Sequence, residues 1–424
     1  MAVDKRITGV ANPDLEVEET VDVEASDIVK GINGDEEIEV EETEEGGAVI
    51  DFDPSSRPLE AGFADNLAEY LDDNTLGRIA RDIVGEVKAD RESRHEWEFS
   101  YTKGLDLLGF KHQERSEPFQ GASSVTHPLL AESVTQFQAS AFKELLPPSG
   151  PVKTSIIGAE SPEVIAQADR VQDFMNYQIT DKMEEYTPDM DQLLFHLPLA
   201  GSAFKKVYYE ATKQSAVSKF IPSEDLIVNY LATDLQSAER VTHIVKISQN
   251  DLLKQQVAGF YRDVDVQTSN EETNIQKKYN ELEGVEKTGY DEEVYTLYEV
   301  HCDLDIEGFE DVDVTTGEAT GIKVPYIVTV DEGSNKILSI YRNYQETDPL
   351  RKKIEYFVHY KFLPGLGFYG FGLIHMLGGL SRTATSTLRQ LIDAGTLSNL
   401  PAGFKAKGIR ISDDDSPLQP GEFR

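Results

Sequence analysis

The spacing of apolar residues changes once along this chain, near Gly201, and this change constrains the fold more than any other feature. In residues 59–200, apolar residues recur every three or four positions, as amphipathic helices require. In residues 201–363, runs such as SAFKKVYYE and VPYIVTVDEGSNKILSIY approach period two and are rich in β-branched and aromatic residues. Because helices and strands are segregated instead of alternating, the sequence predicts an α+β fold.

The first residues of the chain differ from the rest in charge. Of the net charge of −37, residues 1–53 contribute −15, from 18 acidic and three basic residues. Phe52 is the only aromatic residue among them, so this segment has little apolar surface to bury. We expect residues 1–58 to form a disordered acidic tail, either a solvated extension or a docking segment for a basic partner.

The cysteine and histidine content argues against several classes of site. Cys302 is the single cysteine, so the chain cannot form an internal disulfide or a thiolate cluster of its own. The eight histidines are scattered, without the paired spacing of a metal-binding helix. No apolar run approaches the ~18–20 residues of a membrane span. We therefore expect no cofactor, no bound metal and no membrane partner.

The run PGLGFYGFG contains the pattern G-x-G-x-x-G at Gly365, Gly367 and Gly370, a spacing found in dinucleotide-binding loops. A dinucleotide fold also needs an acidic residue about 20 positions later, and none precedes Asp393, which falls inside a helical pattern. The chain is also too short after the loop to complete a doubly wound sheet. We interpret these three glycines and Gly372 as a hinge between strand and helix, with a nucleotide-binding enzyme as the alternative.

The segment after the glycines predicts one long helix, over residues 373–394. Its apolar residues step by three or four positions, so they form one stripe that we expect to be the packing face. A helix of ~22 residues is ~33 Å long, and Gly395 is the expected C-terminal stop. The stripe comprises Leu373, Ile374, Leu377, Leu380, Ala384, Leu388, Leu391 and Ile392.

Two blocks of sequence resemble the portal proteins of tailed bacteriophages, in the larger type found in many short-tailed phages. They are FQGASSVTHPLLAESVTQFQASAFKELLPPSGPVKT and YKFLPGLGFYGFGLIHMLGGLSRTATSTLRQLIDAGTLSNLPAGFKAKGIRI, and the resemblance runs from about Glu117 to Arg424. It implies a structural ring, typically of twelve subunits, rather than an enzyme. The ring would occupy one capsid vertex of the virion, after assembly in the host cytoplasm. Another ring-forming head-to-tail connector is a further possibility.

The resemblance also implies partners and a division of the chain. Double-stranded DNA would pass through the ring, which would contact terminase, tail adaptor proteins, and capsid and scaffolding proteins. Residues 59–200 and 201–363 would form the wing and body, residues 364–395 the hinge and stem helix, and residues 396–424 the start of the clip. Portals of this type continue beyond the clip, so we expect a fragment, a second chain that supplies the remainder, or an unusually short member.

Basic residues gather in the block YKFLPGLG…GIRI and just before it. Residues 351–411 contain nine basic and two acidic residues, a net charge of +7 within an acidic chain. Arg382 and Arg389 lie seven positions apart on one helix face, and we expect them to meet acidic residues of a neighbouring subunit in preference to DNA. Lys405, Lys407 and Arg410 are candidate contacts to DNA phosphates or to an acidic partner.

Overall fold

The computed structural model describes residues 39–42, 48–51, 61–110, 119, 121–210, 213–268, 273–284, 294–312 and 319–399, and it has the α+β composition that the sequence predicted. The helices are η2 (Leu67–Glu69), α1 (Asp73–Ser93), α2 (His95–Leu105), η3 (Asp106–Leu108), α3 (Leu129–Leu145), α4 (Pro162–Tyr177), the π-helix η4 (Gln178–Lys182), α5 (Tyr186–Ala200), α6 (Gln249–Val257), α7 (Asn274–Glu283) and α8 (Leu373–Asn399). The strands are β1 (Glu39–Glu42), β2 (Ala48–Asp51), β3 (Ser202–Glu210), β4 (Ser215–Ile221), β5 (Leu226–Ile227), β6 (Arg240–Ser248), β7 (Val294–Leu304), β8 (Val324–Asp331), β9 (Ile337–Arg342) and β10 (Phe357–Lys361).

The larger sheet is antiparallel, with strand order β5-β6-β7-β8-β9. Helix α1 covers one face, where its buried residues Ile83 and Val87 share a core with Val300 and Val328 of the central strands. The opposite face carries a second cluster around Leu297, to which α6 contributes Leu252. Because both faces are covered, residues of β8 and β9 are buried on both sides of the sheet rather than in alternation.

The smaller sheet has the order β10-β3-β4 and is also antiparallel. Helix α5 packs on it through Leu193 and Leu197, in a cluster with Phe220 and with partly buried aromatic residues of α3. On its other side Phe204 joins a core that contains residues of α2, α3 and α8. Helices from the first half of the chain and strands from the second half therefore share their cores.

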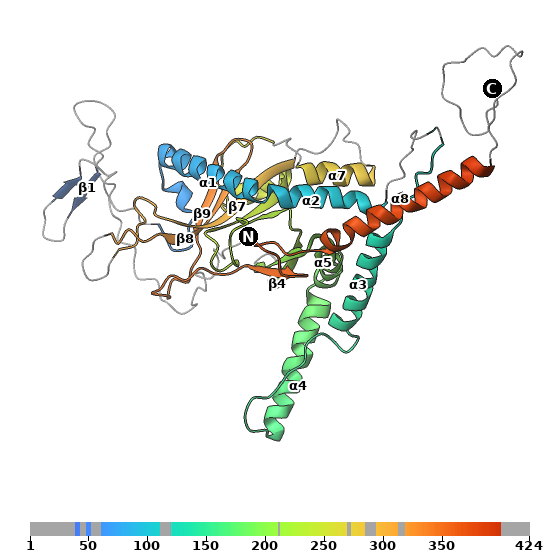
Figure 1. The fold of residues 1–424 in the computed structure, drawn as a ribbon. Coiled ribbons are helices and arrows are strands. Elements are labelled where there is room, and N and C mark those ends of the chain that lie inside the picture. The colour runs from blue at the N-terminus through green and yellow to red at the C-terminus, as the bar shows by residue number, and fades with distance from the viewer. Residues whose placement is uncertain are drawn as a thin grey trace, which may run out of the picture.

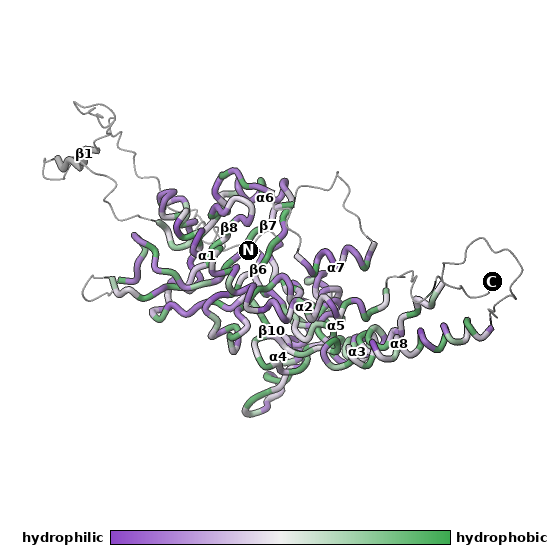
Figure 2. The backbone as a smooth tube through the Cα atoms, turned by 45° about the horizontal axis from the view of Figure 1, so that its top comes forward, coloured by the Kyte–Doolittle hydropathy of each residue, from purple (hydrophilic) through white to green (hydrophobic). Residues whose placement is uncertain are grey.

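Two helices extend away from this body (Figure 1). Helix α4 projects downward in the view, beside the lower end of α3, and none of its residues is buried. Helix α8 leaves the body in a different direction, and it is 27 residues long. In the hydropathy view, α8 is mostly pale or green, whereas purple segments gather on α1 and α7 (Figure 2).

Two expectations change at this level, and a third concerns residues outside the described part of the chain. Within the predicted acidic tail, β1 and β2 form an antiparallel pair, and the rest of residues 1–58 lies outside the described residues. Gly395 does not end α8, which continues through it to Asn399. The wider clip segment beyond Asn399, with Lys405, Lys407 and Arg410, also lies outside the described residues.

Candidate functional site: the glycine junction and helix α8

The glycine-rich segment 364–372 joins β10 to α8 and is anchored in the body by two aromatic residues. Phe368 and Tyr369 are 0% and 2% exposed. The Tyr369 ring stacks on Trp97 with ring centroids 4.7 Å apart, and Phe368 stacks on His359 at 4.6 Å. The Tyr369 hydroxyl lies within hydrogen-bonding distance of the backbone of Leu226 and Val228. The junction is therefore part of the core.

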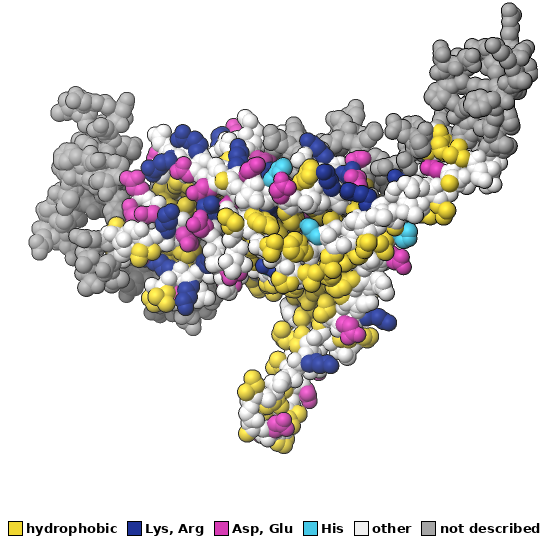
Figure 3. Space-filling view, in the orientation of Figure 1, with side chains coloured by type: hydrophobic (Ala, Val, Ile, Leu, Met, Phe, Trp, Pro, Cys, Tyr) yellow, Lys and Arg dark blue, Asp and Glu magenta, His cyan; other side chains and the backbone are white. Residues whose placement is uncertain are grey.

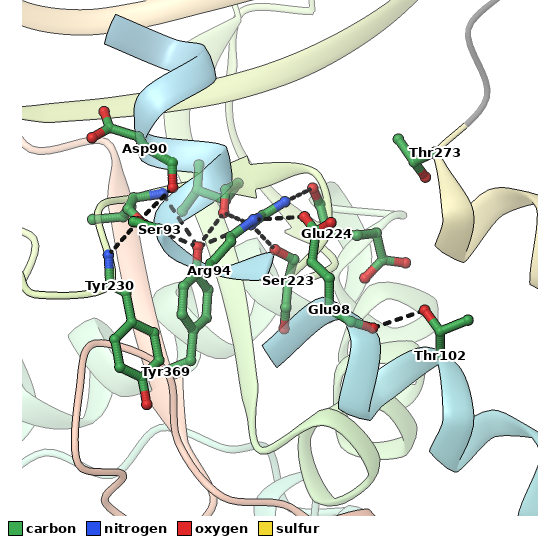
Figure 4. A network of polar contacts seen from close by, with 12 residues as sticks. Asp90, Ser93, Arg94, Glu98, Thr102, Ser223, Glu224, Tyr230, Thr273 and Tyr369 are labelled. Atoms are coloured by element: carbon green, nitrogen blue, oxygen red, sulfur yellow. Dashed lines mark hydrogen bonds and ion pairs between the residues drawn. The ribbon is translucent and has the colours of Figure 1, made fainter. Parts of the chain in front are cut away.

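Arg94, at the turn between α1 and α2, bonds to Tyr369 and is itself 1% exposed (Figure 4). Its Nη1 donates to the Tyr369 hydroxyl at 2.9 Å and to the carbonyls of Ser223 and Leu226, and its Nη2 donates to the carbonyl of Glu224. Its Nε donates to Glu98 at 2.9 Å. A buried guanidinium is tolerated only when its donors are satisfied, and here they fasten the α1–α2 turn to the glycine junction.

Burial alone would lower the pKa of Arg94, but Tyr369 and Glu98 outweigh that effect and hold the pKa above its ordinary value. The guanidinium therefore remains charged despite its burial. Its contacts connect segments more than 100 residues apart in the sequence.

The glycines of the junction are required by close backbone approach. A Cβ atom at Gly370 would overlap with the carbonyl oxygens of Gly201 and Leu363, and one at Gly372 would overlap with the carbonyl of Leu199. A Cβ at Gly367 would lie 2.5 Å from the ring of Tyr230, and one at Gly365 would overlap with the carbonyl of Tyr369. The four glycines form a tightly packed joint between β10 and α8, and their role as a hinge stays a prediction.

The backbone N–H groups of this segment are not arranged as in a nucleotide-binding loop. In such loops the backbone N–H groups point at the phosphates. Here the N–H of Phe368 donates to the Tyr230 carbonyl, that of Gly370 to Ser202 Oγ at 2.8 Å, and that of Phe371 to Leu363. The N–H of Gly372 donates to His375 Nδ1 at 3.1 Å. These four donors are used inside the fold, which argues against the nucleotide-binding alternative.

Helix α8 packs against the body through small and polar residues. Its buried residues are Ile374, Gly378, Ser381 and Thr385, spaced four, three and four positions apart, so they form one row. At Gly378 a Cβ would lie 3.3 Å from Leu107, and Thr385 Oγ1 accepts from the N–H of His127 at 3.1 Å. Small side chains allow the helix to approach the body closely.

The predicted apolar stripe is therefore only partly the packing face. Leu380 is 62% exposed and Leu391 is 70% exposed, while Ile374 is buried. Leu380 and Leu391 lie on one exposed side of the helix with three further exposed residues. We call this set the outer row of α8: Met376, Leu380, Thr383, Thr387 and Leu391. The expectation failed because it ranked residues by hydrophobicity, whereas close helix packing favoured glycine and serine.

The charged residues of α8 all lie away from the outer row. At 3.6 residues per turn, Arg382, Arg389 and Asp393 fall on one side of the helix. Asp393 accepts from the N–H of Ser123 at 2.6 Å, and Arg389 Nε donates to the carbonyl of Val125 at 2.7 Å. These contacts fasten the segment before α3 along the outer half of α8.

Arg382 and Arg389 thus differ in what surrounds them. Arg389 also donates to Thr126 Oγ1 at 3.2 Å, so its guanidinium is engaged with its own chain, which the expected contact with a neighbour did not anticipate. Arg382 is exposed, and its contact with a neighbouring subunit stays a prediction. No local sequence pattern indicates the Arg389 contacts, because their acceptors are mainly backbone carbonyls some 260 residues earlier.

A second cluster of ionisable groups lies between the two sheets. Lys206 Nζ bonds to both oxygens of Glu299, at 2.5 and 2.6 Å, and His301 Nε2 lies 2.8 Å from the same carboxylate. Burial raises the pKa of Glu299, but Lys206 and the histidines outweigh it and hold the pKa well below its usual range. The adjoining cavity measures about 30 Å³, enough for a water molecule or two, and the cluster links β3 of one sheet to β7 of the other.

No model of a known protein family matches the chain, and no curated protein matches it either. Among the described residues, no helix is both long enough and apolar enough to cross a bilayer. In that same part of the chain, no three His, Cys, Asp or Glu side chains gather in positions to hold a metal ion.

Proposed function

We propose that the chain is a subunit of a portal protein of a tailed bacteriophage, and that it acts in a ring at one capsid vertex through which DNA is packaged and ejected. The role is structural, without catalysis. Two sequence blocks that resemble portal proteins support the proposal, and both contribute to the arrangement described above. The first supplies α3 and the segment fastened to α8, and the second supplies the glycine junction and α8 itself.

The observation that carries the proposal is the exposed, uncharged outer row of α8. In a chain with 28% charged residues, a solvated helix of 27 residues would carry seven or eight charges, and α8 has three, all on another side. A long helix that leaves Leu380 and Leu391 exposed in water loses the free energy of burying them. A further protein surface that covers this row accounts for both features, and a neighbouring subunit supplies such a surface at every position of a ring.

The remaining parts of the proposal rest on the resemblance to portal proteins. The ring would contain about twelve subunits and would be found in the virion after assembly in the host cytoplasm. Terminase, tail adaptors, and capsid and scaffolding proteins would dock on its outer surfaces. Double-stranded DNA would pass through the channel without sequence-specific contacts, which is compatible with a predominantly acidic chain.

The proposal is tested by the mass of the purified 424-residue chain in solution, measured by light scattering and imaged by negative stain. A closed ring of about a dozen subunits, with a central channel, is the expected result. The variant Leu380→Glu is the matched control, because it places a charge in the outer row without touching the core. A wild-type chain that stays monomeric over a wide concentration range would contradict the formation of the ring by this chain alone.

A further inference from the structure

Helix α4 has a second exposed face without charge, on a different part of the molecule. Val164, Gln167, Val171 and Phe174 follow one another at intervals of three and four residues, and we call them the outer row of α4. Val171 is 47% exposed and Phe174 62% exposed. Of the charged residues of the helix, Asp169 and Asp173 lie on the opposite side, whereas Glu163 and Arg170 lie beside the row and outside its centre.

The chain covers a different side of α4 with its own preceding segment. Asn176 bonds to the backbone of Val152 in both directions, at 2.9 and 3.2 Å, and Gln172 accepts from the N–H of Thr154 at 3.2 Å. These contacts stiffen the projecting helix and leave its outer row uncovered. Figure 3 shows hydrophobic side chains along this projection, down to its tip.

The two outer rows suit each other in spacing, length and shape. Both repeat at intervals of three and four residues, the pattern by which two helices interlock at a shallow angle. At 1.5 Å per residue, the α4 row spans ~15 Å and the α8 row ~22 Å. The α4 row presents the large side chains of Val171 and Phe174, whereas the centre of the α8 row presents the small Thr383 and Thr387. Large side chains can therefore enter the shallow surface of α8.

Symmetry decides between pairing like rows and pairing unlike rows. A row that packs on the same row of another copy gives a two-fold contact, which closes after two subunits. A ring of more than two subunits needs two different surfaces that meet head to tail. Helices α4 and α8 provide two such surfaces and leave the body in different directions (Figure 1).

We propose that the outer row of α8 in one subunit packs against the outer row of α4 in the next subunit. The partner is a second copy of this chain, and the inference rests on the proposed ring. The pairing brings no charged residue of either helix into the centre of the contact, so it leaves no charge unpaired there. It assigns α4, which has no buried residue in the single chain, a role in assembly.

Disulfide formation in the full chain tests the pairing directly. The only native cysteine, Cys302, is buried, and burial raises the pKa of its thiol to about 12, so it gives little background reaction. The double variant Val171→Cys with Thr383→Cys places one cysteine at the centre of each row. Under mild oxidation we expect a ladder of covalently linked oligomers on a non-reducing gel. The control pairs Thr383→Cys with Asp173→Cys, on the charged side of α4, and we expect no ladder from it.

Charge reversal provides an independent measurement. Val171→Glu and Thr383→Lys each bury an unpaired charge in the contact, and we expect each to lower the assembled fraction about tenfold or more. The two changes together place opposite charges face to face and are expected to restore assembly in part. Because Val171 and Thr383 are both exposed in the single chain, we expect each variant to fold as a monomer. Circular dichroism of each variant checks this.

The outcomes separate this inference from the proposed function. Rings without specific links between the two rows would overturn the pairing and leave the portal proposal intact. Links together with open filaments would support the pairing and contradict the ring. A band of monomer size with an internal disulfide, or a chain that never assembles, would overturn the pairing.

Discussion

Arg94 shows, at the scale of one residue, how the body and the α8 junction are joined. Its guanidinium is shared among three backbone carbonyls, Glu98 and Tyr369, with cation–π contacts to the rings of Trp97 and Tyr369. Removing it leaves a buried carboxylate and several carbonyls without donors. We expect Arg94→Met to lower the free energy of unfolding by about 3–5 kcal/mol.

Urea unfolding followed by circular dichroism measures this change. Arg78→Met is the matched control, since Arg78 lies on the exposed side of α1 and its loss is expected to cost less than about 0.5 kcal/mol. Equal midpoints for the two variants would show that the buried contacts of Arg94 contribute no net stability.

His359 gives the fold a dependence on pH. Its ring lies between Phe204 and Phe368, at centroid distances of 4.5 and 4.6 Å, and burial lowers its pKa to about 3. The unfolded chain binds this proton near pH 6.5, so stability is lost as the pH falls below that value. Between pH 7 and pH 5 the loss from this residue is about 2 kcal/mol.

His359→Phe keeps an aromatic ring at this position but removes the titrating group. We expect the variant to lose less unfolding free energy than the wild type when the pH falls from 7 to 5, by about 2 kcal/mol. His95→Phe, at an exposed site, is the matched control for the exchange of histidine for phenylalanine. An unchanged slope in His359→Phe would mean that this histidine is protonated in the folded protein over the same range.

At the scale of elements, the sequence predicts which helices and strands form better than it predicts how they contact one another. The start of α8 at Leu373 is confirmed, and the hairpin between β8 and β9 forms around the turn residues DEGSN, because local spacing and turn residues determine both. The face by which α8 packs and the partners of Arg389 depend on segments far away in the chain, and no local pattern encodes them. Helix α7 lies in a stretch of mainly polar sequence, yet Ile275 is buried and Tyr279 bonds to Tyr101 of α2. The capping box between Thr273 and Gln276 was the signal that could have revealed it.

Two glycines close to each other in the chain are expected to respond to alanine in opposite directions. At Gly370 the new methyl group would overlap with the backbone of Gly201 and Leu363, which cannot move without displacing β3, so we expect a loss of about 2–3 kcal/mol. At Gly379, on the open surface of α8, nothing lies within 4 Å of an added Cβ, and alanine should stabilise the helix by about 0.5–1 kcal/mol. Thermal unfolding of both variants makes the comparison, and a stable Gly370→Ala variant would mean that the junction can relax.

At the scale of the whole molecule, folding and assembly use different faces of α8. The inner row of Ile374, Gly378, Ser381 and Thr385 belongs to the subunit, and the outer row belongs to the contact between subunits in our proposal. The two functions can therefore be separated by substitution. A change in the inner row should damage the subunit first, and a change in the outer row should affect the mass of the assembly first.

Leu380→Glu and Ile374→Glu compare the two faces within two turns of one helix. Leu380 is 62% exposed, so its replacement is expected to leave the unfolding free energy of the monomer within about 0.5 kcal/mol, while it places a charge in the proposed contact and prevents ring formation. Ile374 is 6% exposed and packs against Gly104, so its replacement should cost several kcal/mol and reduce the yield of folded chain. Light scattering and thermal unfolding, measured on the same samples, give both quantities. Normal rings from Leu380→Glu would show that the outer row faces solvent in the assembly, and the uncharged face of α8 would then need an explanation other than a neighbouring subunit.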